Sequence, residues 1–206
     1  MDKVIIKQMK NIDYKTQEAI RTLRTSLVNS REFENTAVFT SYMGKEGKSF
    51  VAWNTACAMA ATGKKCLYIN ANLREKMSAD IYEAEGLNNT LAAYLKGECK
   101  KAELVYATDK ANLYIIEAGA PCAEATELLD TELYRALIKG LKEEYDYIII
   151  DTPALGEVSD ALVVGKEADG VVIVMEKGMV PYEQAQKMKK QLERNNCKVL
   201  GVVLNK

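Results

Sequence analysis

Short apolar runs rich in β-branched residues alternate with stretches of helical periodicity along the chain. The apolar runs predict strands over 36–41, 66–69, 112–117, 147–150, 170–175 and 199–204. The stretches between them predict helices over 48–61, 90–96, 125–144, 159–166 and 182–195. Several strands are apolar almost without interruption, as a sheet covered on both faces requires. The pattern therefore predicts a single α/β domain over 1–206 with a doubly wound, mostly parallel sheet.

Candidate chemistry gathers at the carboxyl ends of three of these strands. Ligands of doubly wound sheets bind beyond the carboxyl ends of the strands. The loops after Ser41, Ile69 and Ile150 are therefore expected to meet at one place.

Gly47, Lys48 and Ser49 form a relaxed phosphate-loop pattern between a strand and a helix. The strict pattern has glycine where this chain has Tyr42, but the strand ending in Asp151 supports the assignment. We expect Lys48 to reach the outer phosphates of a nucleotide and the amides of 45–49 to face phosphate oxygens. Ser49 and Asp151 are the expected Mg²⁺ ligands. The alternatives are a polar surface turn for the loop, and a helix cap or turn residue for Asp151.

Two asparagines, Asn70 and Asn72, follow the strand over 66–69. In an extended chain both side chains project to the same side, back across the phosphate site. Asparagine keeps the shape of aspartate and one acceptor oxygen but has neither its charge nor its basicity. A metal would lose anionic partners there, and a substrate hydroxyl would lose a proton acceptor. On the residues alone, simple turn positions are the favoured alternative.

A predicted N-terminal helix over 13–30 carries Glu18, Arg21 and Arg24 beside an apolar face of Ile20, Leu23 and Leu27. The spacing of three residues brings the charged side chains together on one side of the helix. From the spacing alone, a solvated charged face is the expected interpretation.

Composition narrows the function classes. The 28 Lys and Arg residues are balanced by 29 Asp and Glu residues. The chain therefore lacks the excess of positive charge that would favour nucleic acid as a partner. No apolar run approaches the roughly 20 residues that span a bilayer, and no signal peptide is recognisable, so a cytoplasmic location is expected. Five cysteines without C-x-x-C spacing indicate reduced thiols, and the absence of histidine excludes histidine chemistry.

These motifs together resemble the bacterial tyrosine kinases of capsule and exopolysaccharide synthesis, over nearly the whole chain. The segment 18–24 is similar to the family helix that joins subunits into a ring. The segment 44–49 resembles the family phosphate loop, 67–74 the strand that normally ends in Asp-x-Asp-x-Arg, and 148–153 the metal-binding Ile-Ile-Asp-Thr-Pro. The runs 158–174 and 201–206 are also family-like, and in related ATPases an asparagine near Asn205 can meet the adenine.

The resemblance implies a P-loop NTPase fold of the deviant-Walker type, shared with septum-placing and partitioning ATPases, and the use of ATP or ADP with Mg²⁺. It implies a ring held by Glu18, Arg21 and Arg24. It also implies activation by a membrane polysaccharide co-polymerase, which would place the protein peripherally at the inner face of the membrane. The site residues that it implies are Gly44, Lys45, Glu46, Gly47, Lys48, Ser49, Phe50 and Asn205 for the nucleotide, and Lys48, Asn70, Asn72 and Asp151 for catalysis.

The chain departs from the family pattern at four places. Gly44 and Lys45 stand at the family's proline and glycine, and Phe50, expected to be a packing residue, replaces a threonine-like residue. Asn70 and Asn72 replace the two aspartates, and the eleven tyrosines are scattered instead of forming a C-terminal cluster. We therefore expect weakened catalysis and no usual phosphoacceptor.

Three hypotheses follow from these residues. The first is an ATP-binding tyrosine-kinase-like protein of exopolysaccharide biosynthesis. The second is a catalytically dead regulatory subunit that binds nucleotide as a structural switch. The third is a partitioning-type ATPase, disfavoured because Met43 stands where such proteins carry a signature lysine.

Overall fold

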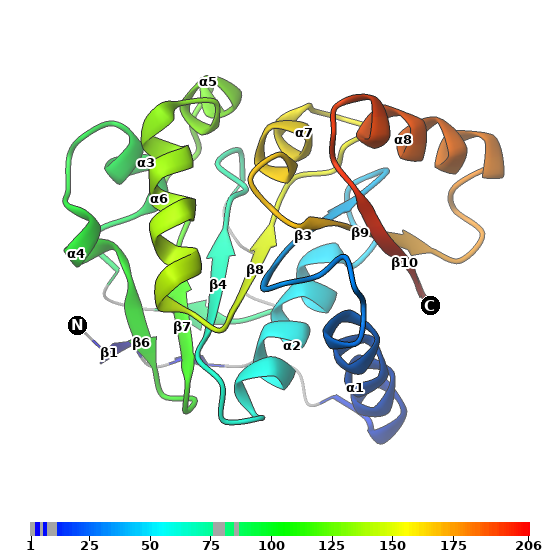
Figure 1. Cartoon of the computed structure of the whole chain (residues 1–206), viewed down its shortest axis with the longest axis horizontal. Coiled ribbons are helices and arrows are strands. Elements are labelled where there is room, and N and C mark those ends of the chain that lie inside the picture. Colours follow the sequence, from blue (N-terminus) through cyan, green and yellow to red (C-terminus); the bar gives the residue numbers. More distant parts are fainter. Residues whose placement is uncertain (1–2, 5, 8–11, 76–80, 85–86) are drawn as a thin grey trace.

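An eight-stranded sheet forms the centre of the molecule (Figure 1). The computed structural model describes residues 3–4, 6–7, 12–75, 81–84 and 87–206. The strand order is β1-β6-β7-β4-β8-β3-β9-β10. All neighbours pair in parallel except β6 and β7, which are antiparallel. The strands are β1 (Lys3–Val4), β3 (Thr36–Ser41), β4 (Cys66–Asn70), β6 (Tyr106–Thr108), β7 (Leu113–Ile116), β8 (Tyr147–Asp151), β9 (Gly170–Glu176) and β10 (Val199–Asn205).

Helices cover both faces of this sheet. The helices α1 (Tyr14–Val28) and α2 (Lys48–Ala60) contribute to an apolar cluster that includes Ile20, Leu27, Trp53 and Met59. A separate cluster on the other face receives side chains from α3 (Leu91–Leu95), α4 (Lys101–Leu104), α5 (Ala125–Leu129), α6 (Glu132–Glu144), α7 (Asp160–Gly165) and α8 (Tyr182–Arg194). The central strands β3 and β4 are buried along their whole length, and β8 and β9 along all but one end residue, because each face has its own core. The predicted doubly wound architecture is confirmed.

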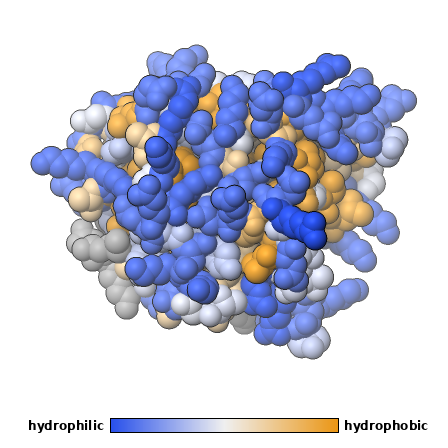
Figure 2. Space-filling view, in the orientation of Figure 1, coloured by the Kyte–Doolittle hydropathy of each residue, from blue (hydrophilic) through white to orange (hydrophobic). Residues whose placement is uncertain are grey.

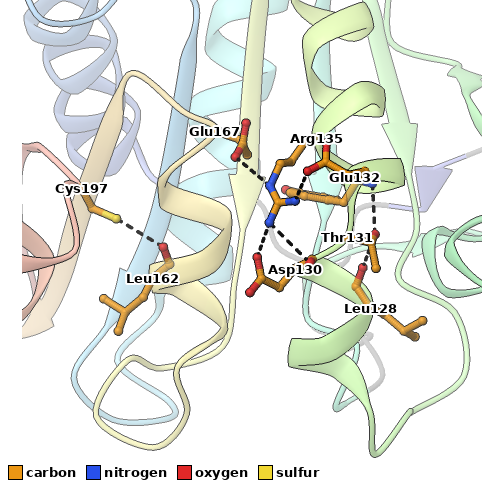
Figure 3. A network of polar contacts seen from close by, with 9 residues as sticks. Leu128, Asp130, Thr131, Glu132, Arg135, Leu162, Glu167 and Cys197 are labelled. Carbon is orange, nitrogen blue, oxygen red and sulfur yellow. Dashed lines mark hydrogen bonds and ion pairs between the residues drawn. The ribbon is translucent and has the colours of Figure 1, made fainter.

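The predicted helix over 125–144 is wrong in one respect, because it is two helices. Thr131 ends the first and caps the second: its hydroxyl donates to Leu128 O at 2.8 Å and accepts from Tyr134 N at 3.2 Å. Arg135 holds the junction through ion pairs to Asp130 and Glu132 (Figure 3). A threonine that satisfies helix-end groups in this way favours a cap over a continuous helix.

Several short elements were not predicted. They include the strands β1 and β6, the helix α4, and a separate antiparallel pair of β2 (Ile6–Lys7) with β5 (Glu83–Ala84). Each has two to four residues, which is too short for a periodic pattern to emerge.

The surface is mostly hydrophilic on the face shown in Figure 2, with apolar side chains visible around β10, where Val202 and Leu204 are exposed. None of the helices in the described ranges combines the length and apolar character needed to cross a bilayer. All five cysteines are free, as the reduced-thiol interpretation expects.

Asp169 fixes the start of β3 against the loop that precedes β9. Its Oδ2 atom accepts hydrogen bonds from the N–H groups of Glu34, Asn35 and Thr36 at 2.9, 2.7 and 2.7 Å. Its Oδ1 atom accepts from Lys142 Nζ at 3.2 Å. Burial raises the pKa of Asp169, but the backbone donors and Lys142 lower it further, so the net shift is downward.

We predict that Asp169→Asn lowers the free energy of unfolding at pH 7 by about 1–2 kcal/mol, because charge-assisted hydrogen bonds are lost. The folded-state pKa lies below the ordinary 3.8, so the contribution is complete above that value and disappears as the pH falls through the folded-state pKa. Urea denaturation across pH 2.5–7 measures the difference. The control is Asp146→Asn, which removes the charge of an exposed carboxylate that accepts from Lys65 N. An equal or pH-independent loss in both variants would contradict the prediction.

Candidate nucleotide site

The loop between β3 and α2 is built around Gly47. This residue has φ 82° and immediately precedes the first turn of α2. The positive φ favours glycine, and a Cβ atom there would lie 2.2 Å from Asn205 Nδ2, so a larger residue would also displace the Asn205 side chain. Within the described part of the chain, no side chain caps the first turn of α2. Its N–H groups are therefore suited to an anionic ligand.

Lys45 also has a left-handed backbone, with φ 67°. This conformation costs a non-glycine residue about 1–2 kcal/mol. The family resemblance implies glycine at this position, and the observed backbone gives the physical reason. Lys45 therefore adopts a conformation that favours glycine.

Lys48, Ser49 and Asp151 meet at the start of α2. Lys48 Nζ donates to Ser49 Oγ at 3.3 Å. Asp151 is fully buried at the end of β8, where its Oδ2 accepts from the Tyr68 hydroxyl at 3.2 Å. Burial raises the pKa of Asp151, while nearby Lys48 and Ser49 oppose that shift.

The Oδ1 atom of Asp151 is buried and has no hydrogen-bond partner among the described residues. Leaving such an oxygen unsatisfied is unfavourable, so the site is suited to a cation. Mg²⁺ prefers oxygen ligands and commonly takes one or two from protein and the rest from phosphate and water. Ser49 and Asp151 fit that donor set. The described residues contain no group of three or more acidic, cysteine or histidine side chains able to hold a metal by themselves.

The Glu46 side chain points into the protein and stabilises the loop, instead of facing the phosphate site. It is 2% exposed, and its carboxylate accepts from Met43 N at 2.6 Å and from Glu176 N at 3.2 Å. Asn205 lies at the same place, because its Nδ2 donates to Glu46 O at 3.1 Å. The structure thus brings Asn205 to the loop, in contact with protein backbone. The contact with adenine that the resemblance implies stays a prediction.

Asn70 and Asn72 both act as turn residues, the alternative that the sequence favoured. Asn70 Oδ1 accepts from Asn72 N at 3.1 Å, and Asn72 Oδ1 accepts from Arg74 N at 3.2 Å. Asn70 Nδ2 donates to Glu117 Oε2 at 3.0 Å. Beyond this turn, Arg74 forms a bidentate pair with the buried Asp160 at 2.8 and 2.9 Å. These contacts anchor the segment after β4.

The remaining candidates lie away from the phosphate loop or pack against the core. Phe50 is half-buried against the apolar cluster of α2, which confirms its packing role. Glu18 and Arg21 form an exposed ion pair on α1. Arg24 Nη1 donates to Ala58 O at 3.3 Å, near the end of α2 opposite the loop. The structure therefore does not bring these three charged residues into the site.

The segment after β8, which sequence reasoning missed, closes against the loop. Leu155 N donates to Ser41 O at 2.8 Å, and Gly44 N donates to Glu157 Oε1 at 2.8 Å. Between them, a Cβ atom on Gly156 would lie 2.2 Å from the Tyr42 carbonyl oxygen. Gly156, five residues after Asp151, was the available signal, but Tyr42, which it approaches, is 114 residues away in the sequence.

The chain is similar to several known proteins over most of its length. A family described as an AAA domain matches residues 35–200. Tyrosine-protein kinase CpsD of Streptococcus agalactiae is 32% identical over 192 residues, covering 93% of this chain and 84% of the relative. The kinase domain of Escherichia coli tyrosine kinase ETK superposes with a TM-score of 0.83 at 29% identity, covering 92% of this chain and 74% of that one. The septum site-determining protein MinD of Pyrococcus horikoshii, complexed with Mg-ADP, gives 0.68 at 26% identity, with 83% and 70% covered.

We predict that Gly156→Ala lowers the free energy of unfolding by about 1–3 kcal/mol, because the added methyl group forces the Tyr42 carbonyl to move. Chemical denaturation measures the loss. Gly201→Ala is the matched control, because a Cβ at that position has nothing within 4 Å. Similar effects of the two substitutions would show that the close approach of Gly156 to the Tyr42 carbonyl does not contribute to the free energy of unfolding.

Proposed function

The chain belongs to the AAA-domain family and to the bacterial tyrosine-protein kinases, and we propose that it is an ATP-binding tyrosine-kinase-like protein of capsular or exopolysaccharide biosynthesis. The observation that carries nucleotide binding is the juxtaposition of the uncapped start of α2 with Lys48 and the unpartnered Oδ1 of Asp151 among the described residues. An anion and a cation are both favoured there, which matches a nucleotide with Mg²⁺.

Each residue has a distinct role in this proposal. The first-turn N–H groups of α2 and Lys48 hold the phosphates. Ser49 and Asp151 hold Mg²⁺, which when bound neutralises charge that develops on the phosphates. Asn205, through its contact with Glu46 O, fixes the loop on which nucleotide binding depends.

Phosphoryl transfer is proposed to be weak, because neither Asn70 nor Asn72 can accept a proton as a carboxylate does. The Oδ1 atoms of both are also occupied by backbone N–H groups. This observation favours a second candidate function, a nucleotide-binding regulatory subunit without turnover. Phosphorylation of a tyrosine peptide by the unmodified protein separates the two. A nucleotide-bridged dimer without a ring would instead favour a partitioning-type ATPase.

The family resemblance supports a membrane polysaccharide co-polymerase as partner and activator, with the protein held peripherally at the inner membrane face. The near balance of 28 basic and 29 acidic residues gives no electrostatic reason to expect nucleic acid.

Lys48→Met is expected to abolish ATP and ADP binding, since a charge-assisted phosphate contact is worth about 1.5–3 kcal/mol and the variant removes its cation. Isothermal titration calorimetry measures the affinity. Lys64→Met is the control, because Lys64 lies on the surface beside Asp146. Absence of binding by the unmodified protein would refute the proposed function.

We further propose that α1 mediates self-association by a head-to-tail contact, which a ring requires. Glu18 and Arg21 are accessible charges of the proposed interface, with side chains 45% and 57% exposed. Arg24 is a poorer probe, because its bond to Ala58 O also supports the fold.

Arg21→Ala is therefore expected to convert an oligomer to monomer in light scattering, with Lys15→Ala, an exposed change on the same helix, leaving the size unchanged. A monomer at high concentration before any substitution would mean that this face is only solvated.

A further inference from the structure

Three polar residues form a row across the ends of β7, β4 and β8. The register pairs Asn70 of β4 with Asp151 of β8. It also pairs Ile69 with Ile116, so Glu117, the residue after β7, lies beside Asn70. The hydrogen bond from Asn70 Nδ2 to Glu117 Oε2 at 3.0 Å joins the first two members. The row therefore reads Glu117, Asn70, Asp151, with a neutral amide between two carboxyl groups.

Glu117 is held without a cation. Its Oε1 accepts from the Tyr82 hydroxyl, and no lysine or arginine of the described residues forms an ion pair with it. Burial raises the pKa of Glu117, and the hydrogen bonds from Tyr82 and Asn70 offset only part of that shift, so the net direction is upward. A half-buried carboxyl group without a counter-charge is uncommon unless a neighbouring site uses it.

We propose that Glu117 is a positioning residue of the nucleotide site, which carries the negative charge that the family resemblance places at position 70. The charge lies one strand further out, and Asn70 transmits its effect by linking the carboxylate to the turn that follows β4 beside Asp151. Three adjacent carboxylates in this row would repel one another strongly at low dielectric. Asparagine at 70 removes that repulsion and supplies a donor to Glu117. The proposal rests on the proposed nucleotide binding.

The hydrogen bond between Asn70 and Glu117 can be tested by exchanging its donor and acceptor. Asn70→Asp alone places two carboxylates face to face and removes the donor. Combined with Glu117→Gln, it restores the hydrogen bond with opposite polarity, because the glutamine amide donates to the new carboxylate. An aspartate at position 70 is therefore expected to be tolerated only when Glu117 is replaced by a neutral residue.

We expect Asn70→Asp to lower the melting temperature by about 4 °C or more and the double variant to recover most of that loss. Mg²⁺ is expected to increase ADP affinity in the unmodified protein. Glu117→Gln should reduce this increase, expressed as the ratio of the affinities with and without Mg²⁺, at least fivefold, and the double variant should restore it. Calorimetry on the four proteins measures both affinities.

Two controls separate charge from structure. Tyr82→Phe removes the other hydrogen bond to Glu117 but keeps its charge, so the Mg²⁺ ratio should stay unchanged. Glu144→Gln removes a surface carboxylate paired with Lys101 and should change neither quantity. If Asn70→Asp does not fold, rescue of folding by Glu117→Gln gives the same support.

If the change in melting temperature of the double variant equals the sum of the changes in the two single variants, residues 70 and 117 are not coupled and the proposed pairing is wrong. ADP binding with an unchanged Mg²⁺ ratio in Glu117→Gln would overturn the positioning role while leaving the proposed function intact. Absence of ADP binding by the unmodified protein would refute the proposed function itself, and the role of Glu117 with it.

Discussion

Parallel pairing of β4, β8 and β3 is the constraint on which the rest of the structure depends. It places Asn70 opposite Asp151, and Asp151 opposite Phe39, so three loops distant in sequence leave the sheet side by side. Interior strands of this kind must be apolar on both faces, which in turn requires helices on both sides. The polar groups of the site are therefore confined to the strand ends.

Carboxylates accept many of the backbone hydrogen bonds that hold the loops of the nucleotide site in place. Glu46 and Glu157 accept from loop N–H groups at this site. At the opposite end of β3, Asp169 accepts in the same way from three consecutive N–H groups. Each satisfies backbone donors that no strand or helix reaches. Acidic side chains thus define the shape of a site whose proposed ligand is itself an anion, and Lys48 and the start of α2 provide the compensating positive potential.

The parts that the sequence predicts are those encoded locally. Uninterrupted apolar runs identify the central strands, and Gly47 with Lys48 and Ser49 identifies the loop. The break at Thr131 and the roles of Glu157 and Glu117 depend on partners that only the fold brings near. Asn70 illustrates the limit: its turn geometry was foreseeable from its side chain, whereas its bond to Glu117 spans 47 residues. Local patterns contain no information on such contacts.

Trp53 stacks on Tyr82 with ring centroids 4.2 Å apart and meets Tyr68 edge-on at 5.2 Å. The hydroxyls of those two tyrosines reach Glu117 and Asp151, the outer members of the row at the strand ends. Trp53 is the only tryptophan of the chain and is fully buried. The molecule therefore contains an intrinsic fluorophore one aromatic ring away from both carboxyl groups, and its emission can report on their electrostatic environment without any attached label.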